Sequence, residues 1–279
     1  MTSVQPRVWL ITGASSGFGR AIAEAALEAG DIVVAAARRT AALDDLVASA
    51  PGRAEALALD VTDADSIDSA VGEVLDRHGR VDVLVNNAGR GAIGAAEETT
   101  DGELRELMDL HFFGPAALTR AVLPGMRERR SGAVVQMSSM GGRFSFPAVG
   151  AYSATKFALE GWSEALAKEV ERFGVRVLIV EPGAFRTSFN GAGSLLISQP
   201  IAAYDDQIGP VRTGMPEDDG KQPGDPSKAA AAILQVLDAE HAPLRLALGD
   251  DAVDRIGEVL DAARAELAEW EQLGRSTVF

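Results

Sequence analysis

Short apolar runs alternate with helical patterns over the first 183 residues, and this alternation limits the folds open to the chain. Each apolar run has the length of a buried strand, at 7–12, 32–37, 54–59, 81–85, 133–137 and 175–180. Helical periodicity fills the segments between them, at 21–29, 40–49, 63–78, 101–126 and 151–173. Strands that alternate with helices build βαβ units. We therefore predict a doubly wound α/β fold, a parallel sheet with helices on both faces.

The periodicity weakens after residue 183. Residues 184–226 are rich in Gly, Pro, Ser and Asp, and a loop this long is either disordered or functional, often as a lid. A helix at 226–237, a strand at 244–248 and a helix at 250–271 follow. We predict a single domain over residues 1–279, with a Rossmann-type sheet of about seven strands. Its parts are a core at 7–183, a substrate loop at about 184–226 and a C-terminal helix–strand–helix at 227–279.

Composition excludes several classes of function. The 26 Lys and Arg against 41 Asp and Glu give a net charge of −15, which argues against a nucleic-acid surface. The chain has no cysteine, and its three histidines lack ligand spacing, so we expect no metal site. We find neither a signal-peptide pattern nor an apolar stretch of membrane-spanning length. A cytoplasmic protein without a membrane segment is expected.

A turn with three glycines, Thr12-Gly-Ala-Ser-Ser-Gly-Phe-Gly19, lies between the first predicted strand and its helix. Glycines let the backbone approach a pyrophosphate, and the helix N-terminus offers N–H donors, so the turn predicts dinucleotide binding. Arg38 and Arg39 stand at the end of the second strand, where a carboxylate would bind a free ribose hydroxyl. Two guanidiniums suit a 2′-phosphate instead. We therefore predict NADP(H) rather than NAD(H).

Tyr152 and Lys156 are four residues apart on a predicted helix, so both side chains lie on one face. A neighbouring cation favours phenolate, and we expect Lys156 to lower the pKa of Tyr152 below its ordinary value of about 10. A tyrosine tuned in this way can act as a general acid or base.

Together, Thr12-Gly-x-x-x-Gly-x-Gly19, Asn86-Asn-Ala-Gly89, Ser139, Tyr152-x-x-x-Lys156 and Pro182-Gly183 resemble the short-chain dehydrogenase/reductase family over residues 7–187. The resemblance implies that Tyr152 exchanges the substrate proton and that Ser139 hydrogen-bonds the carbonyl oxygen. It also implies that Lys156 holds the nicotinamide ribose and lowers the pKa of Tyr152. The expected cofactor-binding residues are Gly13, Ser15, Ser16, Gly17, Phe18, Gly19, Arg38, Arg39, Asp60, Val61, Asn87, Ala88, Gly89, Tyr152, Lys156, Pro182, Gly183 and Thr187. In this set, Asp60 and Val61 would contact the adenine, residues 87–89 the adenosine ribose, and Thr187 the carboxamide.

His111 stands where the family usually has an asparagine that holds a water in a proton relay. A histidine can also bind a water and carry a proton near neutral pH. The alternative is a packed histidine beside Phe112 and Phe113. The sequence leaves both interpretations open.

We therefore predict an NADP(H)-dependent carbonyl reductase or alcohol dehydrogenase, which moves hydride between nicotinamide and a ketone or secondary alcohol. Two alternatives are a non-enzymatic dinucleotide-binding or redox-sensing protein, and an epimerase or dehydratase on the same fold. The apolar residues of segment 184–226 favour an apolar or mixed substrate: Phe185, Phe189, Leu195, Leu196, Ile197, Ile201 and Tyr204. By resemblance we expect a homodimer or homotetramer.

Overall fold

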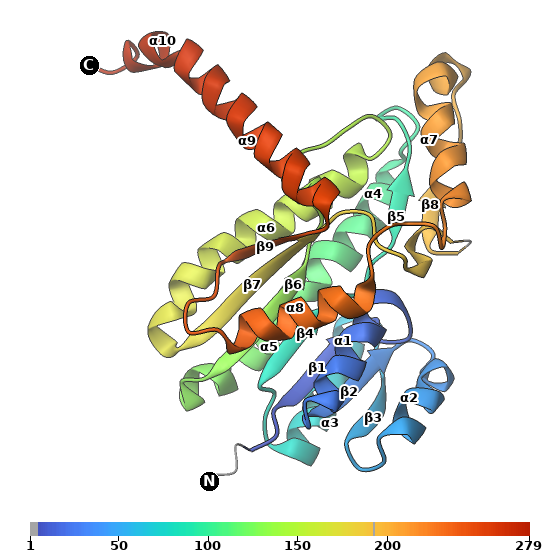
Figure 1. Cartoon of the computed structure of the whole chain (residues 1–279), viewed down its shortest axis with the longest axis vertical. Coiled ribbons are helices and arrows are strands. Elements are labelled where there is room, and N and C mark those ends of the chain that lie inside the picture. Colours follow the sequence, from blue (N-terminus) through green and yellow to red (C-terminus); the bar gives the residue numbers. More distant parts are fainter. Residues whose placement is uncertain (1–4, 192) are drawn as a thin grey trace.

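The computed structural model describes residues 5–191 and 193–279; residues 1–4 and 192, which the predicted domain includes, lie outside that description. Seven parallel strands form the central sheet in the order β3-β2-β1-β4-β6-β7-β9 (Figure 1). They are β1 (Val8–Thr12), β2 (Ile32–Ala37), β3 (Ala54–Ala58), β4 (Val83–Asn86), β6 (Gly132–Met137), β7 (Val175–Pro182) and β9 (Arg245–Leu248). The predicted doubly wound parallel sheet of about seven strands is confirmed.

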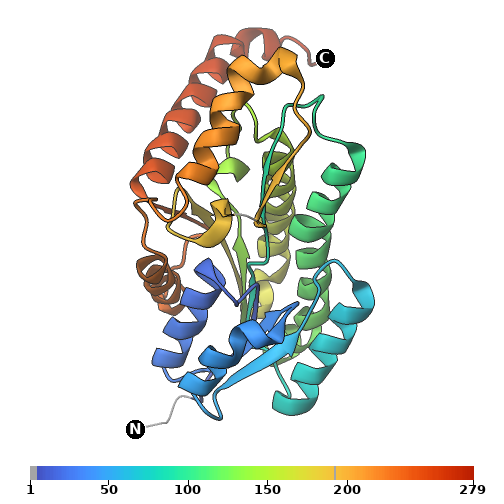
Figure 2. The same cartoon turned by 90° about the vertical axis from the view of Figure 1, so that its right-hand side faces the viewer.

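Helices cover the two faces of this sheet (Figure 2). One face packs against α1 (Gly17–Glu28), the 3₁₀ turn η1 (Thr40–Leu43), α2 (Asp44–Ser49) and α8 (Pro226–Asp238). The other packs against α3 (Ala64–His78), α5 (Gly114–Arg129) and α6 (Gly150–Val170). Strand order reverses between β1 and β4, which makes the edge beyond their carboxyl ends the expected place for a ligand.

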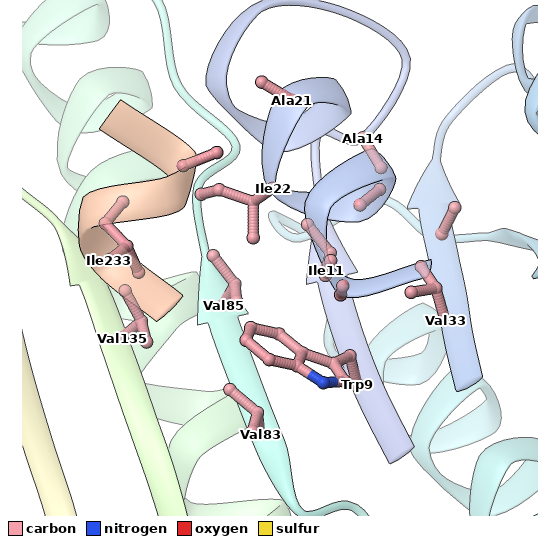
Figure 3. Packing of buried hydrophobic residues seen from close by; sticks show 14 of the residues in the cluster. Trp9, Ile11, Ala14, Ala21, Ile22, Val33, Val83, Val85, Val135 and Ile233 are labelled. Atoms are coloured by element: carbon pink, nitrogen blue, oxygen red, sulfur yellow. The ribbon is translucent and has the colours of Figure 1, made fainter. Parts of the chain in front are cut away.

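The core of the first face is built around Trp9, which is fully buried (Figure 3). Its ring lies among aliphatic side chains of three strands and of helices α1 and α8, including Ile22, Val83 and Ile233. Its indole N–H donates to a carboxylate oxygen of Asp31 at 2.8 Å, so the one polar atom of the ring is satisfied. This packing fixes β1 and thereby the turn that follows it.

The predicted helix at 101–126 is not continuous. It consists of α4 (Asp101–Met108), a wider π-helical turn η2 (Asp109–Phe113) and α5. The backbone N–H of Gly114 bonds to the carbonyl of Asp109, five residues back. Pro115 has no N–H with which to continue the ordinary ladder, so the interruption comes before the Gly114–Pro115 pair, where a kink was predicted. The π turn contains His111.

Segment 184–226 contains more regular structure than its sequence suggests. Strand β8 (Leu195–Ile197) pairs with β5 (Gly91–Ile93) in a small parallel sheet, and α7 (Asp205–Glu217) follows. Short 3₁₀ turns lie at η5 (Ser188–Asn190) and η6 (Ala202–Tyr204). The guanidinium of Arg212 on α7 lies 2.8 Å from Glu98, a carboxylate that also accepts the N–H groups of Ala95 and Ile201. These contacts hold the segment over the sheet edge.

Four further elements complete the description: the 3₁₀ turns η3 (Met140–Gly142) and η4 (Glu171–Phe173), and the C-terminal helices α9 (Asp250–Glu269) and α10 (Glu271–Arg275). Helix α9 leaves the body beside β9 and extends away from it, so that the C-terminus lies far from the sheet (Figure 1). Among the described residues, no helix has both the length and the apolarity needed to cross a membrane.

Candidate active site

The glycine-rich turn between β1 and α1 adopts a backbone that favours glycine. Gly13 has a φ of 64° and Gly17 a φ of 56°, both in the left-handed region. The side-chain amide of Asn87, just after β4, donates to the carbonyl oxygens of Thr12 at 2.9 Å and Gly13 at 3.2 Å. A β-carbon at Gly13 would lie within 2.9 Å of that amide nitrogen. Asn87 therefore braces the turn, and contact of residues 87–89 with a ribose stays a prediction.

Positive groups gather at this edge of the sheet. The first N–H groups of α1 have no partner inside the helix, and no carboxylate stands in its first turn. Arg38 and Arg39 follow β2 and are exposed. The N–H and hydroxyl of Thr62, and after them the charge of Arg38, lower the pKa of Asp60 below its ordinary value. These donors fit the phosphate groups of a dinucleotide.

Ser139, Tyr152 and Lys156 come together beyond the carboxyl ends of β6 and β7. The Ser139 hydroxyl accepts the N–H of Gly141 at 3.0 Å, which fixes its position at the start of η3. Tyr152 and Lys156 lie one turn apart near the start of α6. The Lys156 Nζ lies 5.6 Å from the Tyr152 ring centroid and donates to the carbonyl of Met137 at 2.8 Å. The Ser139 hydroxyl lies close enough to the Tyr152 hydroxyl to lower its pKa.

The pKa of Tyr152 differs from the sequence-based expectation. Burial raises it to about 12, and the hydrogen bond with Ser139 offsets only part of that rise. Burial also lowers the pKa of Lys156 to about 8, against the charge of Glu160, which raises it. Desolvation outweighs the attraction between phenolate and ammonium because the cation lies over the ring and is bound to a backbone carbonyl. Tyr152 is therefore a protonated phenol at neutral pH.

His111 is buried in the π turn, and both of its ring nitrogens are engaged. The N–H of Arg90 donates to Nε2 at 3.1 Å, so the ring proton lies on Nδ1, 2.9 Å from the Thr155 hydroxyl oxygen. That hydroxyl donates in turn to the carbonyl of Tyr152 at 2.7 Å. Burial, followed by the charges of Lys156 and Arg90, lowers the pKa of His111 well below its ordinary value. The geometry favours the packed, neutral histidine over the proton relay.

Two buried carboxylates, Glu160 on α6 and Glu181 on β7, lie beside this site, 3% and 1% exposed. The Ser138 hydroxyl donates to Glu160 at 2.6 Å. Arg245 lies 3.2 Å from Glu160 and 3.4 Å from Glu181, and Arg143 lies 3.0 Å from Glu181. Burial, and then the charge of Glu160, raise the pKa of Glu181 to about 6. This cluster joins α6 to the ends of β6, β7 and β9.

A cavity of about 360 Å³ opens at the three candidate catalytic residues. From the predicted set it is lined by Phe18, Asn87, Gly89, Ser139, Tyr152, Lys156, Pro182, Gly183 and Thr187. Its remaining walls are mostly apolar and include Phe146, Val149, Phe185, Phe189, Val211 and Met215. The last two come from α7, so segment 184–226 supplies part of the cavity wall.

The other predicted residues lie outside the cavity. Gly13, Ser15, Ser16, Gly17, Gly19, Ala88, Arg38, Arg39, Asp60 and Val61 lie at the ends of β1 to β4, along the same sheet edge. The ring of His111 lies 5.5 Å from the ring of Tyr152 and does not line the cavity. The predicted residues thus divide between the sheet edge with the glycine-rich turn and the cavity.

Sequence reasoning missed the carboxylate cluster and the cavity wall on α7. Glu160 stands four residues after Lys156, and Glu181 directly precedes Pro182, so spacing alone could have flagged both carboxylates. Val211 and Met215 carried no such signal, because prolines interrupt the periodicity of α7. In the described ranges 5–191 and 193–279, no cluster of His, Asp and Glu side chains is arranged to hold a metal ion.

Comparisons with known proteins agree with this geometry. The family model described as short chain dehydrogenase matches residues 7–194. An oxidoreductase from Botryotinia fuckeliana, BOA17, is 37% identical over 268 residues, covering 96% of this chain and 97% of that protein. A 3-ketodihydrosphingosine reductase from Bacteroides thetaiotaomicron is 38% identical, covering 88% and 89%. The crystal structure of a short-chain dehydrogenase from Streptomyces avermitilis matches with 61% identity and a TM-score of 0.94, covering 99% and 100%.

Proposed function

Because this chain belongs to the short-chain dehydrogenase/reductase family, an oxidoreductase family, we propose that it is an NADP(H)-dependent carbonyl reductase. The observation that carries the proposal is the convergence of Ser139, Tyr152 and Lys156 on one cavity next to the glycine-rich turn. The substrate would be a ketone, reduced to a secondary alcohol. The reverse reaction, as an alcohol dehydrogenase, uses the same groups.

Each of the three residues has a separate task in this proposal. Bound nicotinamide would supply the hydride that the carbonyl carbon accepts. The Tyr152 hydroxyl gives its proton to the carbonyl oxygen, and the Ser139 hydroxyl, held in place by the N–H of Gly141, donates a hydrogen bond to that oxygen. Lys156 places a positive charge beside the phenol as it loses its proton.

The protonation of Tyr152 favours the reductive direction. A phenol with a pKa of about 12 is protonated at neutral pH and can act as the acid at the start of carbonyl reduction. Oxidation of an alcohol would need phenolate, which burial disfavours.

The preference for NADP(H) rests on Arg38 and Arg39. Both side chains are exposed beyond β2, and neither forms an ion pair within the described part of the chain, so both are free to bind a 2′-phosphate. No acidic residue follows β2 directly at this position, where one would bind a ribose hydroxyl.

The substrate class follows from the cavity wall. Phe146 and Val149, just before α6, and Val211 and Met215, on α7, line the cavity from two segments of the chain. We therefore propose a ketone with an apolar or mixed substituent. The name of the Bacteroides relative, a 3-ketodihydrosphingosine reductase, is consistent with a ketone on an aliphatic chain.

Replacement of Tyr152 tests the reaction. NADPH oxidation should depend on an added ketone, and Tyr152→Phe should reduce kcat by about 10²-fold or more while NADPH affinity changes little. Tyr204→Phe is the matched control, since Tyr204 is the second of two tyrosines and its hydroxyl bonds to Glu97 on the surface. A Tyr152→Phe enzyme with wild-type turnover would show that the proton comes from elsewhere.

Replacement of the two arginines tests the cofactor. Arg38→Ala/Arg39→Ala should weaken NADPH binding about 10- to 100-fold, the value of one or two charged hydrogen bonds, and leave NADH binding almost unchanged. Arg77→Ala is the control, because Arg77 pairs with Glu55 and Glu73 on the surface. Titration of nicotinamide fluorescence measures both affinities. Equal losses for the two cofactors would remove the argument for NADP(H).

Cytoplasmic location and a homodimeric or homotetrameric state are further proposals. The absence of cysteine agrees with a compartment in which disulfides play no part. Cell fractionation tests the location, and the mass in solution tests the oligomer.

A further inference from the structure

The C-terminal helix α9 carries an apolar stripe that no other residue in the described ranges covers. Ala252 and Ile256 are buried against the body, whereas every residue from Leu260 to the C-terminus is exposed. Leu260, Leu267 and Trp270 continue the face of Ile256 at helical spacing, and they are 51%, 74% and 59% exposed. The face that packs on the body therefore continues along the part of α9 that extends away from the body (Figure 1).

The length of this exposed part makes a partner necessary. Residues 257–275 form an arm: residues 257–269 continue α9 for about 20 Å at the usual rise of a helix, and α10 follows after Trp270. An isolated helix of this length is marginal in water, and most helical stability in proteins comes from packing of an apolar face. Further large apolar side chains, Leu273 within the arm and Val278 and Phe279 beyond it, are also exposed. The arm is built to pack against another surface.

Charge narrows the choice of that surface. Residues 250–275 contain eight carboxylates and three arginines, a net charge of −5. Helices that lie on membranes carry Lys and Arg on their polar face, because anionic lipids attract them. An acidic arm is repelled by such a surface, and two arms packed side by side would repel each other. The surface that fits the arm is apolar with a basic rim.

This chain presents such a surface near the C-terminal ends of α5 and α6. A groove of about 410 Å³ lies between α5, the end of α6 and η4. Leu123, Val170 and Phe173 supply its apolar part, and Arg120, Arg127 and Arg172 stand around it with a single carboxylate, Glu169. Within residues 5–191 and 193–279, none of the three arginines forms an ion pair. Arg172 lies over the ring of Phe173, 4.6 Å from its centroid, which leaves Arg120 and Arg127 to meet carboxylates and the ring of Trp270.

We propose that the arm of one copy docks into this α5–η4 groove of a second copy, and that the arm of the second copy docks into the same groove of the first. The reciprocal exchange closes a twofold assembly, as in most homo-oligomers. It joins acidic to basic and apolar to apolar surfaces. The inference rests on the homo-oligomer proposed above, names the surface that forms it, and is independent of the reaction.

The mass of the assembly in solution tests the proposal. Light scattering and sedimentation of the full chain should show an oligomer whose mass halves in Leu260→Glu/Leu267→Glu. Ala265→Glu, on the opposite face of the same helix, adds one carboxylate away from the stripe and should leave the mass unchanged. All three positions are exposed, so the variants should keep the circular dichroism and NADPH affinity of the wild type.

Variants of the groove identify where the arm docks. Arg120→Glu/Arg127→Glu should also halve the mass, and adding Glu266→Arg/Glu271→Arg to it should restore the mass of the wild type. An unchanged mass in the groove variant would overturn the assigned surface, and an unchanged mass in the arm variant would overturn the role of the arm. A monomeric wild type, or one that binds anionic vesicles as a monomer, would overturn both the arm and the homo-oligomer and leave the proposed reaction standing.

Discussion

Lys156 is a buried cation, and its burial should be measurable as a loss of stability. Lys156 is 6% exposed, and its ammonium donates a hydrogen bond to the carbonyl of Met137. Burial lowers its pKa from 10.5 to about 8. A shift of this size corresponds to about 3 kcal/mol at 1.36 kcal/mol for each pKa unit. The pKa of Lys156 is lower in the folded state than in the unfolded state. The unfolding free energy is therefore highest above about pH 10.5, and about 3 kcal/mol of it is lost as the pH falls through about 8. Lys156→Met removes the titration and fills a similar volume.

Urea unfolding of the cofactor-free protein at about pH 7 and pH 10.5 measures this term. Relative to wild type, Lys156→Met should gain about 3 kcal/mol of unfolding free energy on going from the higher pH to the lower. Lys168→Met is the matched control, since Lys168 lies on the same helix with its side chain 75% exposed. A stability difference between Lys156→Met and wild type that stays constant with pH would refute the reasoning.

The same substitution should abolish carbonyl reduction. At neutral pH the variant would then be inactive but more stable than the wild type. This is expected where activity requires a charged group whose burial destabilises the fold. Activity of the variant near the wild-type level would show that the charge of Lys156 has no part in the reaction.

Two further predictions concern the groups around the candidate catalytic residues. His111→Asn retains at most one of the two ring hydrogen bonds, so it should cost about 1–3 kcal/mol of unfolding free energy. Its pH–rate profile should keep its shape between about pH 5 and 8, and a step gained or lost there would indicate a proton relay. The pKa of Glu181, raised from 4.5 to about 6, adds stability that is complete below pH 4.5 and lost as the pH rises through 6. Relative to Glu181→Gln, the wild type should lose roughly 2 kcal/mol over that interval, and a gain would contradict the direction of the shift.

Much of the fold could be predicted from local pattern. The alternation of apolar runs and helical periodicity led to the seven-stranded parallel sheet, because each pattern is set by which side chains one strand or helix must bury. The meeting of Ser139 with Tyr152 also followed from it, since carboxyl ends of parallel strands share one edge. The helix at 101–126 was less well predicted, because the π turn before Gly114 depends on the hydrogen bonds open to a segment that contains Pro115.

The residue types at the site, and the sheet edge where they stand, follow from the sequence alone. Their protonation does not, because the pKa of Tyr152 depends on how much water the surrounding segments exclude. The hydrogen bonds of the His111 ring, with the backbone of Arg90 and with Thr155, also come from the tertiary structure. The wall supplied by α7, held through Arg212 and Glu98, was likewise invisible in the sequence. Spacing along one element is a local property, whereas desolvation and hydrogen-bond partners come from segments far apart in the chain.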